Sequence, residues 1–507
     1  MDDMQGMSRT LRDMSRLLSD GRNPDPAHKH GCVQLNIGRC PYAPGVKKTL
    51  ATLAAATMIA TLGAQALAAP ARTSLDPYFP LDGNPGIDAL GYRVKVAYDF
   101  DSRVLRGTTR IRLKATQDLS AFNLDFLLDV DSVRVDGAKA AFQRQGTHEL
   151  TITPATALAA DSTHTVVVRY ADRPGRHHYA GEQNWNANRR EVVAINEPHM
   201  APWWFPSNDH PSDKALMDIT VAAPAGMQAI ANGRQVSRKK HGQKTLWRWR
   251  SSQPMATYLA FFALGHFQIE RGTDAGVPWV NAVSRGLGKT QSRFALKWLR
   301  RTPTILRWLV KELGPYPFDS AGGLVTSLGF GFALENQTRP VYPWAGTEDW
   351  LLVHELAHQW FGDSVSVSKW QDIWLNEGFA TYAEQRWAET HGGATADKWL
   401  RHQYEVLSAG NEWWRISLAD PGAENIFESA IYLRGGMALV ALRRVIGPDT
   451  FANLLRTWVS DHRLGHGTTA EFQALAEQVS GQDLDAFFAV WLAGATPPPD
   501  TAAYGLG

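Results

Sequence analysis

Cysteine is scarce in this sequence, which has two in 507 residues, Cys32 and Cys40. Both precede a segment that we expect to be removed, so the mature chain would carry no disulfide and no thiolate metal site. The two could resemble half of a zinc ribbon, but the chain offers no second pair. Any metal must therefore be held by histidine and carboxylate side chains.

An excess of charge of one sign is also missing. The chain has 52 Lys+Arg and 50 Asp+Glu, which gives a formal net charge of +2. This balance argues against a broad nucleic-acid surface, although a local basic patch would escape a count over the whole chain. Internal repeats of solenoid length are absent as well. The length, with 44% hydrophobic residues, suggests two or three domains with cores of their own.

Long uncharged runs are limited to one, over residues 49–68, which follows two lysines. It ends in the small-residue pattern Ala66-Leu67-Ala68, so we expect a signal peptide cleaved after Ala68. A membrane anchor is the alternative, but Ala and Thr dominate the run and disfavour residence in lipid. We therefore expect a secreted or periplasmic protein without a stable membrane anchor. Residues 1–45 precede this signal, and we interpret them as an annotation artefact, with the biological start near Val46.

Two blocks with different hydrophobic periodicity follow the leader. Over residues 73–276 apolar and polar residues alternate, as in the run from Tyr92 to Tyr98, which predicts an N-terminal antiparallel β domain. Over residues 277–495 the spacing becomes helical, which predicts a mainly helical second domain and an α+β multidomain protein. The helices are expected at about 290–305, 348–361, 377–390, 429–444, 450–461 and 469–479. Residues 496–507 begin with a run of prolines and are expected to be a flexible tail.

One motif in the second block carries chemistry. His354 and His358 stand at i and i+4, so on a helix both imidazoles project from one face and can share a metal ion. Glu355 follows the first histidine, where it can take a proton from a metal-activated water. Two surface histidines would give the same spacing by chance, so the interpretation needs a third ligand.

Glu377 supplies that ligand in the segment Trp374 to Ala380. The spacing from His358 leaves room for one loop and the start of an antiparallel helix. Two imidazoles and one carboxylate leave the fourth tetrahedral position open, which is typical of a catalytic zinc site. The alternative for Glu377 is a solvated carboxylate that the helix dipole favours in a first turn.

Further segments make the sequence resemble a known family, the gluzincin aminopeptidases, which include aminopeptidase N and leukotriene hydrolase. The resemblance covers residues 77–492 and implies a thermolysin-like catalytic domain behind the β domain, with one zinc ion. The matching segments, in chain order, are Glu197-Pro198, Trp204 to Pro206, Asp209 to Lys214, Gly314 to Phe318, Phe332 to Asn336, the zinc segment, and Tyr432 to Gly436.

The resemblance also implies roles for residues outside the metal motif. Phe332 to Asn336 matches the exopeptidase motif, so Glu335 would bind the α-ammonium group of a peptide and Ala333 would contact the substrate. Glu197 matches a second carboxylate for the same ammonium group, donated by the β domain. Tyr432 matches the tyrosine that donates a hydrogen bond to the oxyanion of the intermediate.

The expected function is zinc-dependent removal of the N-terminal residue from peptides or proteins, with no nucleic-acid partner. Two other enzyme classes stay open. A zinc endopeptidase would share the metal site but would not need Glu335, and an epoxide hydrolase of the same family would need a lipid channel. A binding protein with a degenerate site would have lost a motif residue, yet His354, Glu355, His358 and Glu377 are all present.

Overall fold

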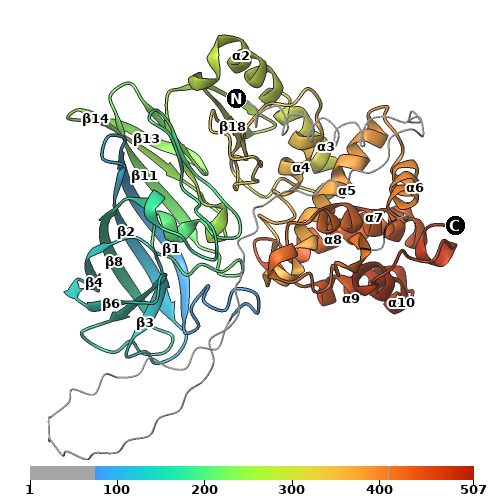
Figure 1. Ribbon diagram of the computed structural model, residues 1–507, viewed down its shortest axis with the longest axis horizontal. Helices are drawn as coiled ribbons and strands as arrows, with labels where there is room; N and C mark the ends of the chain where they lie inside the picture. The colour runs from blue at the N-terminus through green and yellow to red at the C-terminus, as the bar shows by residue number, and fades with distance from the viewer. Residues whose placement is uncertain (1–74, 409, 411) are drawn as a thin grey trace, which may run out of the picture. The chain divides into compact units, whose positions relative to one another are not determined.

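The computed structural model describes residues 75–507 apart from 409 and 411. The expected leader, the signal peptide and both cysteines lie outside the described residues. Within that range no helix combines the length and the apolar character needed to cross a membrane. Figure 1 shows the strands of the first block gathered beside the helices of the second.

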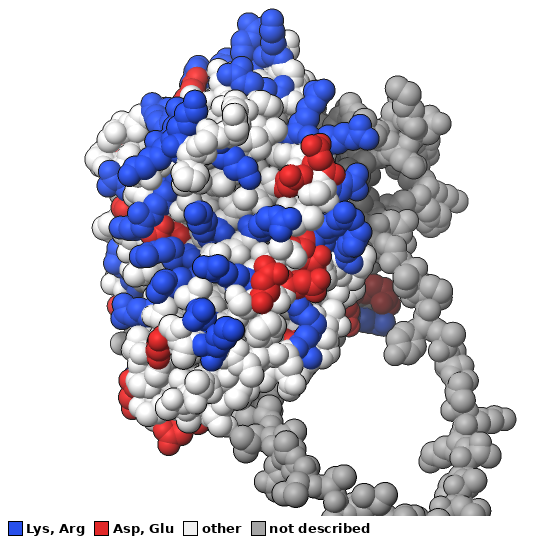
Figure 2. All heavy atoms as spheres, turned by 90° about the vertical axis from the view of Figure 1, so that its left-hand side faces the viewer, with Lys and Arg blue, Asp and Glu red and all other residues white. Residues whose placement is uncertain are grey.

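An eight-stranded sheet dominates the N-terminal region, which we call the β region. Alternation builds it as expected, since Tyr92, Val94, Val96 and Tyr98 point into the core while the polar residues between them face outward. In the order of the sheet, its strands are β13 (Arg234–His241), β14 (Lys244–Arg250), β11 (Leu216–Pro224), β1 (Ile87–Asp99), β2 (Val104–Ala115), β8 (Thr163–Asp172), β4 (Val130–Val135) and β5 (Ala138–Lys139). Figure 2 shows the outward face of this sheet, on which Lys and Arg predominate.

One pair of strands departs from the antiparallel arrangement that the sequence predicts, because β1 and β11 run parallel, with Arg93 opposite Asp218. They lie far apart in the sequence, so a long connection can reverse the direction of the chain between them. Two smaller sheets complete the region. One orders β12 (Gln228–Ala231), β15 (Phe262–Gly265), β10 (Val192–Ala194) and β9 (Asn186–Ala187), and the other orders β3 (Phe122–Asp125), β7 (Glu149–Thr153) and β6 (Ala141–Gln145).

The second region, which the sequence predicts to be catalytic and which we call the catalytic region, opens with a four-stranded sheet. Its order is β16 (Phe267–Asp274), β17 (Val277–Ser284), β18 (Ala321–Val325) and β19 (Val341–Tyr342). The domain boundary expected between residues 276 and 277 falls in the turn of the β16–β17 hairpin. Because the two strands pair along their whole length, the catalytic sheet begins at Phe267 instead.

Helices make up most of the remaining chain. They are α2 (Gly288–Leu299), α3 (Thr302–Leu313), α4 (Trp350–Ala357), α5 (Trp374–Thr390), α6 (Ala396–Leu407), α7 (Ser429–Ile446), α8 (Pro448–Asp461), α9 (Thr469–Ser480) and α10 (Asp485–Phe488). The short strands β20 (Ser366–Val367) and β21 (His466–Gly467) pair between them. Buried side chains of both regions form one hydrophobic cluster.

The last residues are packed, although the sequence predicts a flexible tail over residues 496–507. Leu506 is fully buried, and Trp491 Nε1 donates a hydrogen bond to the backbone oxygen of Tyr504 at 3.1 Å. Arg401 also pairs with Asp500 at 2.8 Å. The burial of Leu506 holds this end of the chain in place. The run of prolines before it suggests a flexible tail and gives no sign of this contact.

Candidate active site

Helix α4 positions the two histidines of the motif. His354 lies in its last turn and His358 caps its end, with ring centroids 4.8 Å apart. The helix is buried along most of its length, since Leu352, Val353 and Ala357 are inaccessible to solvent. This packing fixes the face from which both imidazoles project.

Helix α5 brings Glu377 to the histidines from its first turn. Glu377 Oε2 lies 3.2 Å from His354 Nε2 and 3.5 Å from His358 Nε2. Burial alone would raise the pKa of Glu377, but the two histidines outweigh burial and lower the pKa to about 2. The three side chains therefore present two imidazole nitrogens and an ionised carboxylate to one point.

The surroundings of the histidines decide which ring nitrogens are free. His358 Nδ1 lies 3.0 Å from the backbone oxygen of Phe361, and His354 Nδ1 lies 2.6 Å from Glu384 Oε1. Both oxygens accept hydrogen bonds, so each Nδ1 donates its proton and each Nε2 is the nitrogen that faces Glu377. Against the effect of burial, the neighbouring carboxylates raise the pKa of both histidines, and a metal ion would displace the second proton at Nε2. The donor set, two imidazoles and one carboxylate, fits a zinc ion with an open fourth position.

Glu355 lies beside the metal ligands without being one of them. It is 4% exposed, and burial raises its pKa to about 8, against the opposing effect of His354 and His358. A carboxylate with a pKa in this range can take up and release a proton near neutral pH. This pKa suits a general base, the role that the sequence predicts for Glu355.

Tyr432 reaches the site from the first turn of α7, and its ring centroid lies 6.0 Å from that of His354. Burial, followed by the charges of Glu377 and Glu197, raises its pKa well above the ordinary value. The hydroxyl group therefore keeps its proton and can donate a hydrogen bond.

Two further carboxylates lie close to the metal ligands. Glu335 is 2% exposed, and burial raises its pKa. Burial also raises the pKa of Glu197, and the largest charge effect on it comes from Glu335, followed by Glu377. Among the described residues, Oε1 of each of these two side chains has no hydrogen-bond partner. Ala333 lies half-buried two residues before Glu335.

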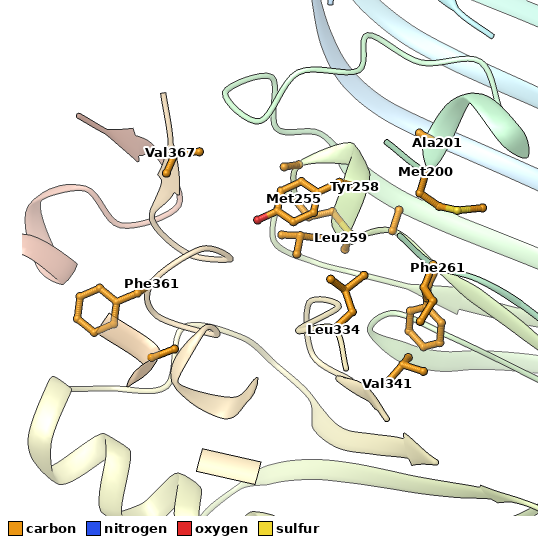
Figure 3. Close-up of a cluster of buried hydrophobic side chains, with 14 of the residues drawn as sticks. Met200, Ala201, Met255, Tyr258, Leu259, Phe261, Leu334, Val341, Phe361 and Val367 are labelled. Atoms are coloured by element: carbon orange, nitrogen blue, oxygen red, sulfur yellow. The ribbon is translucent and has the colours of Figure 1, made fainter. Parts of the chain in front are cut away.

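A hydrophobic cluster joins the segments that carry these two carboxylates. Figure 3 shows Met200, which follows Glu197 along the chain, in one cluster of buried side chains with Phe261 and Leu334. Leu334 precedes Glu335 and pairs with Val341 through backbone hydrogen bonds of 2.8 and 2.9 Å. The β region and the catalytic region therefore share one core at the point where they supply Glu197 and Glu335.

Sequence reasoning missed two residues of the site. Glu384 accepts the Nδ1 proton of His354, and its place seven residues after Glu377 on α5, two turns along the same face, could have revealed it. Tyr258 has a buried hydroxyl without a partner among the described residues, and the charges of Glu197 and Glu335 help burial to raise its pKa. No local pattern marks Tyr258, because its neighbours are distant in sequence.

The fold and the site together define a two-domain protein with a His-His-Glu zinc site. The model of the peptidase M1 N-terminal domain matches residues 89–259, and the model of the peptidase family M1 domain matches residues 347–491. The chain belongs to peptidase family M1, which confirms the expected family, the zinc cofactor and the arrangement of a β domain before a helical catalytic domain.

Solved structures show the same arrangement. The M1 zinc metallopeptidase of Deinococcus radiodurans is 27% identical, with a TM-score of 0.77 over 84% of this chain and 98% of that chain. A variant of that protein has been crystallised with a Tyr-Ser-Ala substrate.

Curated relatives are longer. Tricorn protease-interacting factor F2 of Thermoplasma acidophilum is 24% identical over 81% of this chain and 53% of its own. Aminopeptidase N of Lactococcus lactis is 25% identical over 62% of this chain and 40% of its own. The chain thus spans about half the length, or less, of these relatives.

Proposed function

We propose that this protein is a zinc-dependent aminopeptidase that removes the N-terminal residue of peptides or proteins. The observation that carries the proposal is the pair of buried carboxylates, Glu335 and Glu197, next to the His354, His358 and Glu377 site. Each has a carboxylate oxygen without a partner among the described residues. A buried carboxylate needs a cation or a hydrogen-bond donor, and a peptide α-ammonium group supplies both.

The side chains divide the work of hydrolysis among them. Zinc held by His354, His358 and Glu377 would supply Lewis-acid chemistry toward water and a peptide carbonyl. Glu335 and Glu197 would hold the α-ammonium group, which fixes the scissile bond one residue from the amino end. Their charge-assisted hydrogen bonds contribute roughly 1.5–3 kcal/mol each.

Glu355 and Tyr432 would act on the reacting atoms in different ways. Glu355 would accept a proton from the attacking water and return it to the leaving amine. The Tyr432 hydroxyl would donate a hydrogen bond to the carbonyl oxygen as that oxygen becomes negative. The raised pKa of Tyr432 supports this role, because an ionised tyrosine could not donate.

The test compares free and blocked amino ends. Purified protein is assayed against a panel of aminoacyl chromogenic amides and against matched peptides with a free or an acetylated N-terminus, with and without a chelator. We expect cleavage of free-amine substrates only, abolished by the chelator and recovered with zinc. Equal cleavage of free and acetylated peptides would instead favour a zinc endopeptidase.

A variant separates anchoring from catalysis. Glu335→Gln keeps the shape of the side chain but removes its charge, so kcat/KM for free-amine substrates should fall about 10- to 150-fold. The zinc content should stay that of the wild type. Unchanged kcat/KM would contradict the anchoring role of Glu335.

We further propose an extracytoplasmic location, supported by the uncharged run that ends at Ala68. Expression from a start at Val46 should yield a mature protein that begins near Ala69 outside the cytoplasm, as N-terminal sequencing of the isolated protein would show. Retention of residues 1–45 would contradict the proposed start.

A further inference from the structure

The outward face of the eight-stranded sheet carries a dense array of basic side chains (Figure 2). Strand alternation and register place them on one side of β13, β14, β1, β2 and β8. We call this surface the basic face; it comprises Arg93, Lys95, Arg106, Arg110, Arg112, Lys114, Arg169, Arg234, Lys239, Lys244, Arg248 and Arg250. The whole chain has a net charge of only +2, so positive charge is concentrated here.

Acidic residues compensate only part of this charge. Asp218 is shared by three arginines, with its closest contact to Arg248 and longer ones to Arg250 at 3.2 Å and Arg93 at 3.9 Å. Asp161 pairs with Lys114 at 2.7 Å. Within the described part of the chain no ion pair involves five other members of the face, Lys95, Arg106, Arg110, Arg112 and Arg169.

Register also places like charges opposite one another. Arg93 lies opposite Arg110 across β1 and β2, and Arg234 lies opposite Arg250 across β13 and β14. Among the residues that the structure describes, Asp218 contacts only one member of each pair, Arg93 and Arg250, and directly opposed like charges destabilise a sheet. Solubility alone does not require this arrangement, since interspersed charges of both signs provide it without the repulsion. A negatively charged partner would relieve the repulsion.

The geometry of the face identifies the kind of partner. Neighbouring strands lie about 4.8 Å apart and outward residues recur about every 6.7 Å along a strand, so the charges form a two-dimensional array. Most of them are arginines, whose planar guanidinium groups bind phosphate oxygens bidentately. A two-dimensional array of phosphate groups is the surface of an anionic phospholipid bilayer.

Nucleic acid fits this face less well. The aromatic residues of these strands, such as Tyr92, Trp247 and Trp249, are buried on the opposite side of the sheet, so they offer no platform on which bases could stack. The face also extends across more strands than the two-stranded ribbon that a DNA major groove admits. We propose that the basic face docks the protein reversibly on anionic phospholipid membranes.

This docking would leave the zinc site free. The metal ligands are carried by α4 and α5 of the catalytic region, whereas the basic face belongs to strands of the β region. The proposal does not depend on the aminopeptidase activity. Its consequence is that the protein is concentrated at anionic membranes by electrostatic attraction, without an inserted anchor.

The experiment measures partition of the full chain onto vesicles by flotation. Phosphatidylcholine vesicles are compared with vesicles that contain about 30% phosphatidylglycerol, at low and at physiological salt. We expect binding only to the anionic vesicles, weakened by salt because screening shortens the reach of surface charge. Binding to neither type of vesicle at low salt, or to both equally, would overturn the proposal.

Variants locate the binding surface. Arg110→Gln with Arg112→Gln should lower the partition coefficient about 30-fold, since each basic residue near an anionic surface contributes about fivefold. Arg110→Lys with Arg112→Lys retains the charge and should retain most of the binding. The control variant, Lys297→Gln with Lys398→Gln, removes two exposed lysines from α2 and α6 and should bind like the wild type.

All four proteins share the same N-terminal segment, so a difference among them reports on the basic face. Thermal unfolding of each establishes that the strand substitutions leave the fold intact. An equal loss in the control variant would overturn the proposal, because it would show an effect of net charge alone. Tighter binding of a duplex DNA oligomer than of anionic vesicles at the same salt would overturn it in favour of nucleic acid.

Discussion

Single residues of the site are governed by an excess of buried negative charge. Glu197, Glu335 and Glu355 each have a pKa raised by burial and by their carboxylate neighbours, while Glu377 stays ionised beside the histidines. Such a group is stabilised either by taking up protons or by binding cations. A metal ion and a peptide α-ammonium group would supply the cations. The buried carboxylates lower the stability of the fold, and they also favour the binding of these two ligands.

The role of Glu355 can be separated from that of the metal ligands. Glu355→Gln keeps the volume of the side chain but removes the proton acceptor, so the rate should fall by a factor of about 10² to 10⁴. Bound zinc, measured by atomic absorption, should remain. His358→Ala is the matched comparison and should lose the metal. Near-normal turnover of Glu355→Gln would show that another group is the base.

His199, two residues after Glu197, makes the stability dependent on pH. Its Nε2 lies 2.6 Å from Asp82 Oδ2, and its Nδ1 lies 3.4 Å from Glu182 Oε2. Burial alone would lower the pKa of His199, but these carboxylates raise it to about 10. Between pH 6.5 and 10 the folded protein therefore keeps a proton that the unfolded chain releases, and stability falls as the pH rises.

Urea unfolding at pH 6.5 and at pH 9.5 tests this linkage. The free energy of unfolding of the wild type should be lower at pH 9.5. His199→Asn should be less stable by about 1–3 kcal/mol at pH 6.5, since Asp82 Oδ2 loses its charged partner while Oδ1 keeps Tyr179 and His148, and should lose less on going to pH 9.5. The same decline in both proteins would assign the pH dependence to other groups.

At the scale of elements, the site depends on how closely α5 and α7 approach. Gly378 and Gly435 face one another, and a Cβ atom on Gly378 would lie 2.9 Å from backbone carbons of Gly435. Glu377 directly precedes Gly378 on α5, and Tyr432 lies about one helical turn before Gly435 on α7. Two glycines therefore set the distance between a metal ligand and the proposed oxyanion donor.

Gly378→Val should force the two helices apart and destabilise the protein by about 1–3 kcal/mol. Zinc affinity and turnover should fall with it, because Glu377 moves with α5. Gly329→Val is the control, since no heavy atom lies within 4 Å of a Cβ there, and it should change the free energy of unfolding by less than about 1 kcal/mol. Equal stability of the two variants in urea would contradict the close approach.

At the scale of the whole molecule, the β region contributes to the proposed active site. It supplies Glu197, and it also supplies Lys214, whose Nζ donates hydrogen bonds to the backbone oxygens of Asp363 at 2.9 Å and Ser364 at 2.8 Å. Asp363 and Ser364 lie in the segment that follows His358 after the end of α4. Burial lowers the pKa of Lys214 to about 7, so the ammonium group is costly to keep there and is held by these two oxygens.

Lys214→Met keeps the apolar stem but removes both donors. It should destabilise the protein by about 1–3 kcal/mol for each carbonyl left without a partner and should weaken zinc binding, because the segment after His358 loses its support. Urea unfolding and zinc titration measure the two effects. Lys297→Met, at an exposed position of α2, is the control, and a Lys214 variant as stable as this control would contradict the link between the regions.

The sequence pattern specifies features that are local in the chain. The helical repeat places His354 and His358 on one face of their helix. It also places Glu377 and Glu384 on one face of the next long helix. Alternation in the run from Tyr92 to Tyr98 likewise determined which side of its strand is buried. In each case the residues concerned lie within a few turns or a single strand.

The tertiary structure decided which distant segments meet. Glu197 and Glu335 become neighbours because Met200 and Leu334 enter one buried cluster, and no periodicity records that contact. The basic face depends on the register of strands as far apart in sequence as β1 and β14, so a nearly neutral composition concealed it. Burial and charge proximity are properties of three-dimensional packing, and they alone turn ordinary glutamates into groups that require a cation.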